Sequence, residues 1–144
     1  MSLPKPLTDT CRTTVRFSEV DALGIVWHGN YVKYLEDGRE SFGRNFSLGY
    51  IDVYEAGLLT PVVKMEIDFK QQVKYGETVL IETTHVDVEA AKIVFNYRIL
   101  RESDGEVVLT ATTTQVFLNT DGELELSHPE FYTRWRKQQG MMAE

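Results

Sequence analysis

The chain has 144 residues, a length that fits one domain with a substantial hydrophobic core. Its net charge of −7 argues against a broad nucleic-acid-binding surface, which needs an excess of positive charge. Its single cysteine excludes an intrachain disulfide, and no apolar run reaches the roughly 18 residues of a membrane-spanning helix. We therefore expect one domain over residues 1–144. We expect it in the cytoplasm, without membrane insertion and without a nucleic-acid partner.

The first half of the chain predicts a strand followed by one long helix. Residues 12–20 alternate between apolar and polar side chains and predict the strand. From Asn30 to Phe46, apolar residues recur at three- and four-residue steps, which predicts the helix. Gly38 lies inside this apolar stripe, where glycine costs about 1 kcal/mol relative to alanine. We expect that Gly38 allows the helix to approach a sheet closely, and that residues 47–61 form a connecting segment.

The second half of the chain predicts a sheet and a short final helix. Four further strands are predicted over residues 63–70, 78–88, 92–100 and 107–118. The first of these alternates most regularly, which predicts one buried face. A turn at residues 103–105 joins the last two strands as a hairpin, and a short helix follows over about residues 128–138. Five strands that pair as antiparallel neighbours and one apolar helix form two layers around a single core, which is the α+β class.

The segment between the first strand and the helix carries the candidate chemistry. Asp21 follows the strand, and His28 precedes the helix. The N-terminus of a helix has unpaired backbone N–H groups and about half a positive charge. Acyl transfer needs a nucleophile or general base together with donors for an oxyanion. Asp21 and His28 are therefore the candidate catalytic residues; the alternative is a turn role for Asp21 and a loop role for His28.

Residues 21–31, Asp-Ala-Leu-Gly-Ile-Val-Trp-His-Gly-Asn-Tyr, with Glu36 five residues later, resemble the signature of hotdog-fold acyl-CoA thioesterases. More narrowly, they resemble the 4-hydroxybenzoyl-CoA thioesterase family and its YbgC-like branch, and the resemblance extends from about residue 12 to about residue 120. It implies a five-stranded antiparallel sheet wrapped around one long central helix. It also implies a homodimer with active sites at the subunit interface, and a dimer of dimers. Some relatives carry a tyrosine four residues before the acid, whereas this chain has Phe17, which offers no hydroxyl.

The same resemblance assigns roles to individual residues. Asp21 corresponds to the catalytic acid of the family, acting as nucleophile or general base, and His28 to a histidine of the YbgC-like branch. Backbone N–H groups near His28 and Gly29 are expected to polarise the thioester carbonyl, and His28 to orient the substrate or protonate the leaving thiolate. Gly29, Asn30 and Tyr31 are the predicted substrate-binding residues at the helix start.

The resemblance implies an acyl-CoA or acyl-carrier-protein thioester as substrate, so that coenzyme A is part of the substrate and no cofactor is expected. Lys92 is the first candidate to bind the phosphates of coenzyme A, because it begins a strand after a tight turn. The other candidates are Lys70, Lys74, Arg98 and Arg101. No histidine pair has a metal-ligand spacing, so no metal is expected.

Two other functions stay open from the sequence. The same fold hosts hydratases and dehydratases that act on acyl thioesters, but these resemble a Pro-Gly helix entrance where this chain has Gly29-Asn30. The second alternative is a non-catalytic scaffold that binds acyl thioesters. Thiol release from the substrate, water addition to an unsaturated acyl group, and binding without turnover distinguish the three functions.

Overall fold

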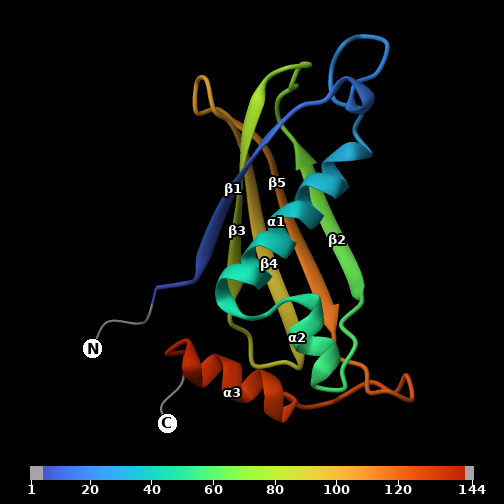
Figure 1. Ribbon diagram of the computed structural model, residues 1–144, viewed down its shortest axis with the longest axis vertical. Helices are drawn as coiled ribbons and strands as arrows, with labels where there is room; N and C mark the ends of the chain where they lie inside the picture. The colour runs from blue at the N-terminus through green and yellow to red at the C-terminus, as the bar shows by residue number, and fades with distance from the viewer. Residues whose placement is uncertain (1–4, 142–144) are drawn as a thin grey trace.

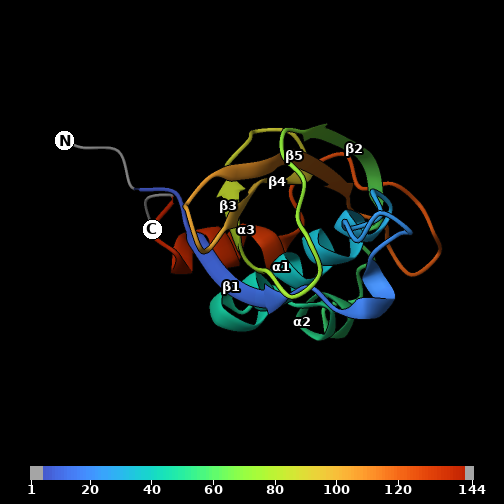
Figure 2. The same cartoon turned by 90° about the horizontal axis from the view of Figure 1, so that it is seen from above.

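A curved five-stranded sheet and one long helix form the body of the molecule. The computed structural model describes residues 5–141, so residues 1–4 and 142–144 of the predicted domain lie outside the described part. The strands are β1 (Thr8–Thr14), β2 (Val62–Phe69), β3 (Thr78–Val86), β4 (Lys92–Arg101) and β5 (Val107–Val116). Their order is β1-β3-β4-β5-β2, and every neighbouring pair is antiparallel. The sheet wraps around α1 (Asn30–Phe46), as Figures 1 and 2 show, which confirms the predicted α+β class and layer arrangement.

Helix α1 lies very close to the sheet at Gly38. A methyl group built on Gly38 would lie 2.5 Å from the Thr83 side-chain oxygen and 2.7 Å from Cγ2 of Ile81, both in β3. Such separations are shorter than van der Waals contact, so only glycine fits at this crossing. One helical turn later, the Phe42 ring packs edge-to-face on Phe95 of β4 at 5.0 Å. The predicted reason for a glycine in the apolar stripe is therefore confirmed.

The first strand lies earlier in the chain than predicted. β1 covers Thr8–Thr14 rather than residues 12–20, because its pairing with β3 ends where Thr14 meets Thr78. The chain then turns through a short 3-10 helix, η1 (Phe17–Glu19), which leaves the Phe17 side chain 78% exposed. The alternating residues 12–20 thus include the end of β1 and the turn that follows it. This turn leads directly into the Asp21 loop.

Two short helices cover one end of the sheet. The predicted connecting segment 47–61 contains α2 (Tyr50–Glu55), which at six residues is too short to show a helical period. The C-terminal helix α3 (Glu130–Gln138) lies within the predicted 128–138 range. Both lie beside the end of the sheet at which β4 begins (Figure 1). None of the helices in the described residues is long and apolar enough to span a bilayer.

Strand β2 forms an open edge of the sheet. It pairs with β5 on one side, and no strand of the described chain covers its other side. Val63 and Phe69 are 58% and 55% exposed, while Met65 and Ile67 are only partly buried. The prediction that this face of β2 is buried is therefore wrong within one chain, because an edge strand has a neighbour on one side only. Exposed strand edges of this length pair readily with another chain.

Candidate active site

Asp21 lies in a tight hairpin loop between η1 and α1. Its backbone N–H donates to the carbonyl of Ile25 at 2.8 Å, and the Gly24 N–H donates to the Asp21 carbonyl at 2.9 Å. Gly24 has a φ of 78°, a conformation that favours glycine. The Asp21 Oδ1 accepts a hydrogen bond from the Leu23 N–H at 2.8 Å. Within residues 5–141, Oδ2 receives no hydrogen bond, so one carboxylate oxygen is fixed and the other is free to react.

The start of α1 supplies two free backbone donors. The helix begins at Asn30, with Gly29 at the N-cap position. The N–H groups of His28 and Gly29 precede the first helical turn, and neither has an acceptor in the part of the chain that the structure describes. The partial positive charge of the helix N-terminus adds to these donors. This end of α1 can therefore stabilise an oxyanion.

His28 belongs to an aromatic cluster that joins the helix start to the sheet edge. Its ring centroid lies 5.1 Å from that of Trp27 and 6.5 Å from that of Phe69, which ends β2. The Tyr31 ring lies 5.8 Å from Phe69 in turn. His28, Trp27 and Phe69 are exposed, so the cluster offers an apolar surface to a ligand beside the free backbone donors.

The side chains of Asn30 and Tyr31 are internal rather than open to a substrate. Asn30 is 7% exposed, and its Nδ2 donates to the backbone carbonyl of Glu19 at 2.8 Å. Tyr31 is 4% exposed and hydrogen-bonds to the backbone of Val73; burial raises its pKa. Within one chain, both side chains therefore make their contacts with the protein itself, and substrate binding by residues 29–31 stays a prediction.

Glu19 connects this loop to the helix through hydrogen bonds, and no sequence signal marked it as part of the site. Its carbonyl oxygen accepts hydrogen bonds from the Trp27 N–H at 2.9 Å and from Asn30 Nδ2 at 2.8 Å. Its Oε1 accepts from the Arg16 N–H at 2.8 Å and from the Tyr34 hydroxyl at 3.0 Å. Burial and the carboxylate together raise the pKa of Tyr34, so the phenol stays a donor. Sequence patterns consist of residue types, and every residue has a backbone carbonyl. The role of the Glu19 carbonyl therefore has no sequence signature.

Lys92 does not lie near these residues within one chain. It pairs with position 116 of β5, whereas Phe69 pairs with position 109, so seven residues separate the two positions. At about 3.3 Å per residue, the separation along the sheet is about 23 Å. Lys74, in contrast, forms an isolated β-bridge with Ile25 and is exposed beside the Asp21 loop. Of the basic residues predicted to meet the phosphates, Lys74 is therefore the one that a β-bridge holds beside the Asp21 loop.

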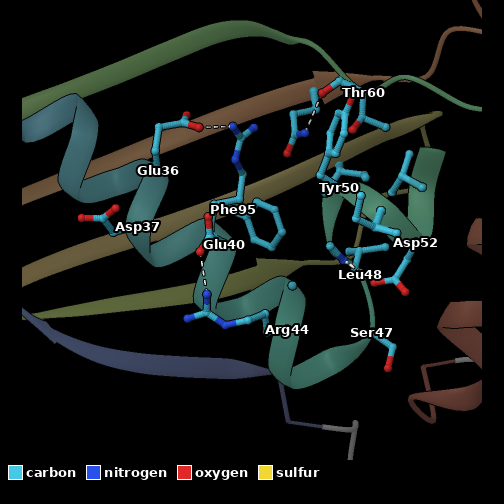
Figure 3. Close-up of a pocket in the computed structure, with 17 residues that line it drawn as sticks. Glu36, Asp37, Glu40, Arg44, Ser47, Leu48, Tyr50, Asp52, Thr60 and Phe95 are labelled. Atoms are coloured by element: carbon cyan, nitrogen blue, oxygen red, sulfur yellow. Dashed lines mark hydrogen bonds and ion pairs between the residues drawn. The ribbon is translucent and has the colours of Figure 1, made fainter. Parts of the chain in front are cut away.

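A cavity of about 630 Å³ lies between α1, α2 and the sheet, at the Lys92 end of the molecule. Figure 3 shows Glu36, Asp37 and Glu40 along α1 on one side and Tyr50 of α2 on the other. Gln115 lines the cavity; its Nε2 donates to the Thr60 carbonyl at 2.7 Å. The apolar part of the lining comes from Leu48, Val53, Ile93 and Phe95. Sequence reasoning did not predict this cavity because it depends on α2.

The described residues contain no group of three or more His, Cys, Asp or Glu side chains placed to hold a metal ion. The candidate reactive groups are instead the Asp21 carboxylate, with one oxygen that receives no hydrogen bond, and the two backbone donors at the start of α1 that follow it in the chain. A helix of this kind within a wrapped antiparallel sheet is the architecture of hotdog-fold thioesterases.

The chain belongs to the Thioesterase-like superfamily, whose pattern it matches over residues 15–135. It is 31% identical over 127 residues to YneP of Bacillus subtilis (strain 168), a protein named as a candidate acyl-CoA thioesterase, covering 85% of this chain and 91% of YneP. It is 28% identical over 103 residues to the acyl-CoA thioesterase YbgC of Haemophilus influenzae, covering 71% and 74% of the two chains. The solved structure of 4-hydroxybenzoyl-CoA thioesterase from Pseudomonas sp. strain CBS-3 superimposes with a TM-score of 0.76 at 26% identity, covering 89% and 98%.

Proposed function

We propose that this chain hydrolyses acyl-CoA thioesters, with Asp21 and the start of α1 as its catalytic centre. The observation that carries the proposal is a carboxylate with a free oxygen in a loop hydrogen-bonded to a helix start with two unpaired N–H groups. Family membership and the names of the relatives support the same reaction. Thioesters of acyl carrier protein are a second substrate class, which the same reactive groups would accept.

In the proposed mechanism, the thioester carbonyl oxygen accepts hydrogen bonds from the N–H groups of His28 and Gly29. Negative charge develops on this oxygen as the carbonyl carbon is attacked, and the two donors stabilise it. The free Oδ2 of Asp21 either attacks the carbon to form a mixed anhydride, which water then hydrolyses, or removes a proton from an attacking water. The carbon–sulfur bond breaks, and His28 orients the substrate or gives a proton to the leaving thiolate. Either route yields the free acid and coenzyme A, with no cofactor consumed.

We further propose that two copies pair through their β2 edges and that these dimers associate in pairs. The open edge of β2 and its exposed Val63 and Phe69 support the first contact. In an antiparallel pair of β2 strands, the Val62 end of one strand lies beside the Phe69 end of the other. The His28 cluster of one copy would then lie next to the Thr60 end of the second copy.

This pairing would give the cavity between α1 and α2 a role in substrate binding. The cavity reaches Thr60, two residues before β2 begins, so it lies at the end of β2 that meets the second copy's catalytic centre. It would receive the acyl group. Lys92 lies at this same end of the sheet, and through the second copy it stays a candidate for the phosphates.

The test is thiol release from a panel of acyl-CoA and acyl-carrier-protein thioesters. Asp21→Asn should lower kcat by about 10²–10⁴-fold, the usual contribution of a general base. His28→Ala should reduce turnover substantially, and Asp121→Asn, at an exposed aspartate in the turn after β5, is the matched control that should leave it unchanged. Full activity of Asp21→Asn would refute the assignment. Acyl-CoA binding without thiol release would indicate a scaffold, and water addition to crotonyl-CoA would indicate a hydratase.

A further inference from the structure

The loop that carries Asp21 is fastened to α1 through a single residue, Glu19. Within residues 5–141, the two hydrogen bonds that join residues 15–26 to side chains of α1 both end on Glu19, one from Asn30 and one from Tyr34. The remaining backbone bonds of residues 15–26 lie within this segment, come from Trp27, or join it to residues 73–77, for example from the Val26 N–H to the Val73 carbonyl at 2.8 Å. The bonds to residues 73–77 attach the loop to the segment that precedes β3. The contacts of Glu19 are therefore the hydrogen bonds that hold the loop at a set distance from the side chains of α1.

We propose that Asn30 is a positioning residue that sets the Asp21 carboxylate relative to the backbone donors of α1. This inference rests on the proposed function. Asn30 is the first residue of α1, so it moves together with the N–H groups of His28 and Gly29. Its Nδ2 holds the carbonyl of Glu19, two residues before Asp21. Because Asn30 is only 7% exposed and its side chain has only two torsions, it fixes this separation closely.

Tyr34 makes the same connection one helical turn later. Its hydroxyl donates to Oε1 of Glu19, and the same oxygen accepts the Arg16 N–H, which closes the η1 turn. The two contacts from α1 thus hold both the main chain and the side chain of Glu19. Asn30 acts on the main chain directly, so its loss should displace Asp21 more than the loss of the Tyr34 hydroxyl does.

The expected defect is in the chemical step rather than in binding. A displacement of about 1 Å between reacting groups can lower a rate by about 10²-fold. Asn30→Ala and the equal-volume Asn30→Asp, which replaces the donor with an acceptor, should each lower kcat by about 10- to 100-fold. Tyr34→Phe should lower kcat less. The KM for acyl-CoA should change by less than about threefold, because neither side chain lines an open site.

A double-mutant cycle with Asp21→Asn gives the sharpest test. If Asn30 acts through Asp21, Asn30→Ala should lower the residual activity of Asp21→Asn by less than about threefold, although it costs at least 10-fold in the wild type. The control is Tyr132→Phe, which removes a 2.7 Å hydrogen bond to His85 at the other end of the molecule. It should lower the melting temperature as Asn30→Ala does and leave kcat unchanged.

Several outcomes would overturn the proposal. A raised KM with unchanged kcat would make Asn30 a substrate contact. An equal loss of kcat in the wild-type and Asp21→Asn backgrounds, or in Tyr132→Phe, would leave Asn30 with a structural role only. If Asn30→Ala does not fold, Asn30→Asp and Tyr34→Phe carry the same cycle. Full activity of Asp21→Asn alone is a different result, since it refutes the catalytic role of Asp21 itself.

Discussion

Adding one methyl group at Gly38 should force α1 away from the sheet. The new Cβ would lie 2.5 Å from the Thr83 oxygen, and ordinary contact begins near 3.4 Å, so the helix must move by about 0.9 Å or the side chains of β3 must yield. Thr83 and Ile81 are fully buried and β-branched, which restricts their movement. Overpacking of this kind costs about 1–3 kcal/mol, while the helix propensity of alanine returns about 1 kcal/mol. We expect Gly38→Ala to lower the free energy of unfolding by up to about 2 kcal/mol.

Urea and thermal unfolding measure this loss, which corresponds to a fall in Tm of up to about 6 °C for a domain of this size. Lys33→Ala, at an exposed position of the same helix, is the control and should stay within about 0.5 kcal/mol of the wild type. In a Thr83→Ala background the Gly38→Ala substitution should cost less, because the shortest contact is gone. A Gly38→Ala variant about 1 kcal/mol more stable than the wild type, as at an open helix position, would refute the close approach of helix and sheet.

Three further predictions concern pH, charge and association. Burial lowers the pKa of His85 to about 4, so between pH 6.5 and 4 the unfolded chain binds a proton that the folded chain does not. Stability should therefore be lost as pH falls through this window, by about 3 kcal/mol in urea unfolding, and a His85→Phe variant that keeps the same slope would contradict this cause. Lys74→Ala should raise the KM for acyl-CoA several-fold at low salt and much less at 0.5 M salt, because salt screens the attraction between a lysine and a phosphate. Lys137→Ala, at an exposed position of α3, is the control. Equal effects of the two substitutions on KM would exclude a phosphate contact by Lys74. Val63→Lys should weaken self-association in analytical ultracentrifugation without lowering the melting temperature of the monomer, since Val63 is 58% exposed within one chain, and an unchanged oligomer would place the interface elsewhere.

Periodicity and turn signals predicted the central helix and most of the strands, whereas the wrapping of the sheet around the helix was implied by the family resemblance. The apolar steps from Asn30 to Phe46 identified α1, and the position of Gly38 among them predicted a close helix–sheet crossing, which the structure confirms. The strand predicted at residues 12–20 was placed too late in the chain, because the apolar–polar alternation continues past the end of β1 into a turn. The face of β2 that alternation predicts to be buried is half exposed, because burial there depends on a neighbour that the sequence of one chain does not contain.

The candidate site was predictable where it rests on residue types, and not where it rests on three-dimensional proximity. Asp21 and His28 could be singled out because a carboxylate and a helix start have recognisable sequence signals. Glu19 could not, because its main contacts use a backbone oxygen that every residue possesses. Lys92 was chosen by its place after a turn. Strand register puts it about 23 Å from Phe69 of the same chain, so its predicted role depends on the proposed pairing of two copies, which one sequence does not show.

The open edge of β2 has a consequence for how the activity would depend on the amount of protein. If the edges pair as proposed, a single chain holds Asp21 and the helix donors but lacks the cavity that the second copy brings. By mass action, dilution below the dimer dissociation constant would then lower the rate per chain, and concentration would restore it. The level of expression would thus set the fraction of chains that are active as well as their number.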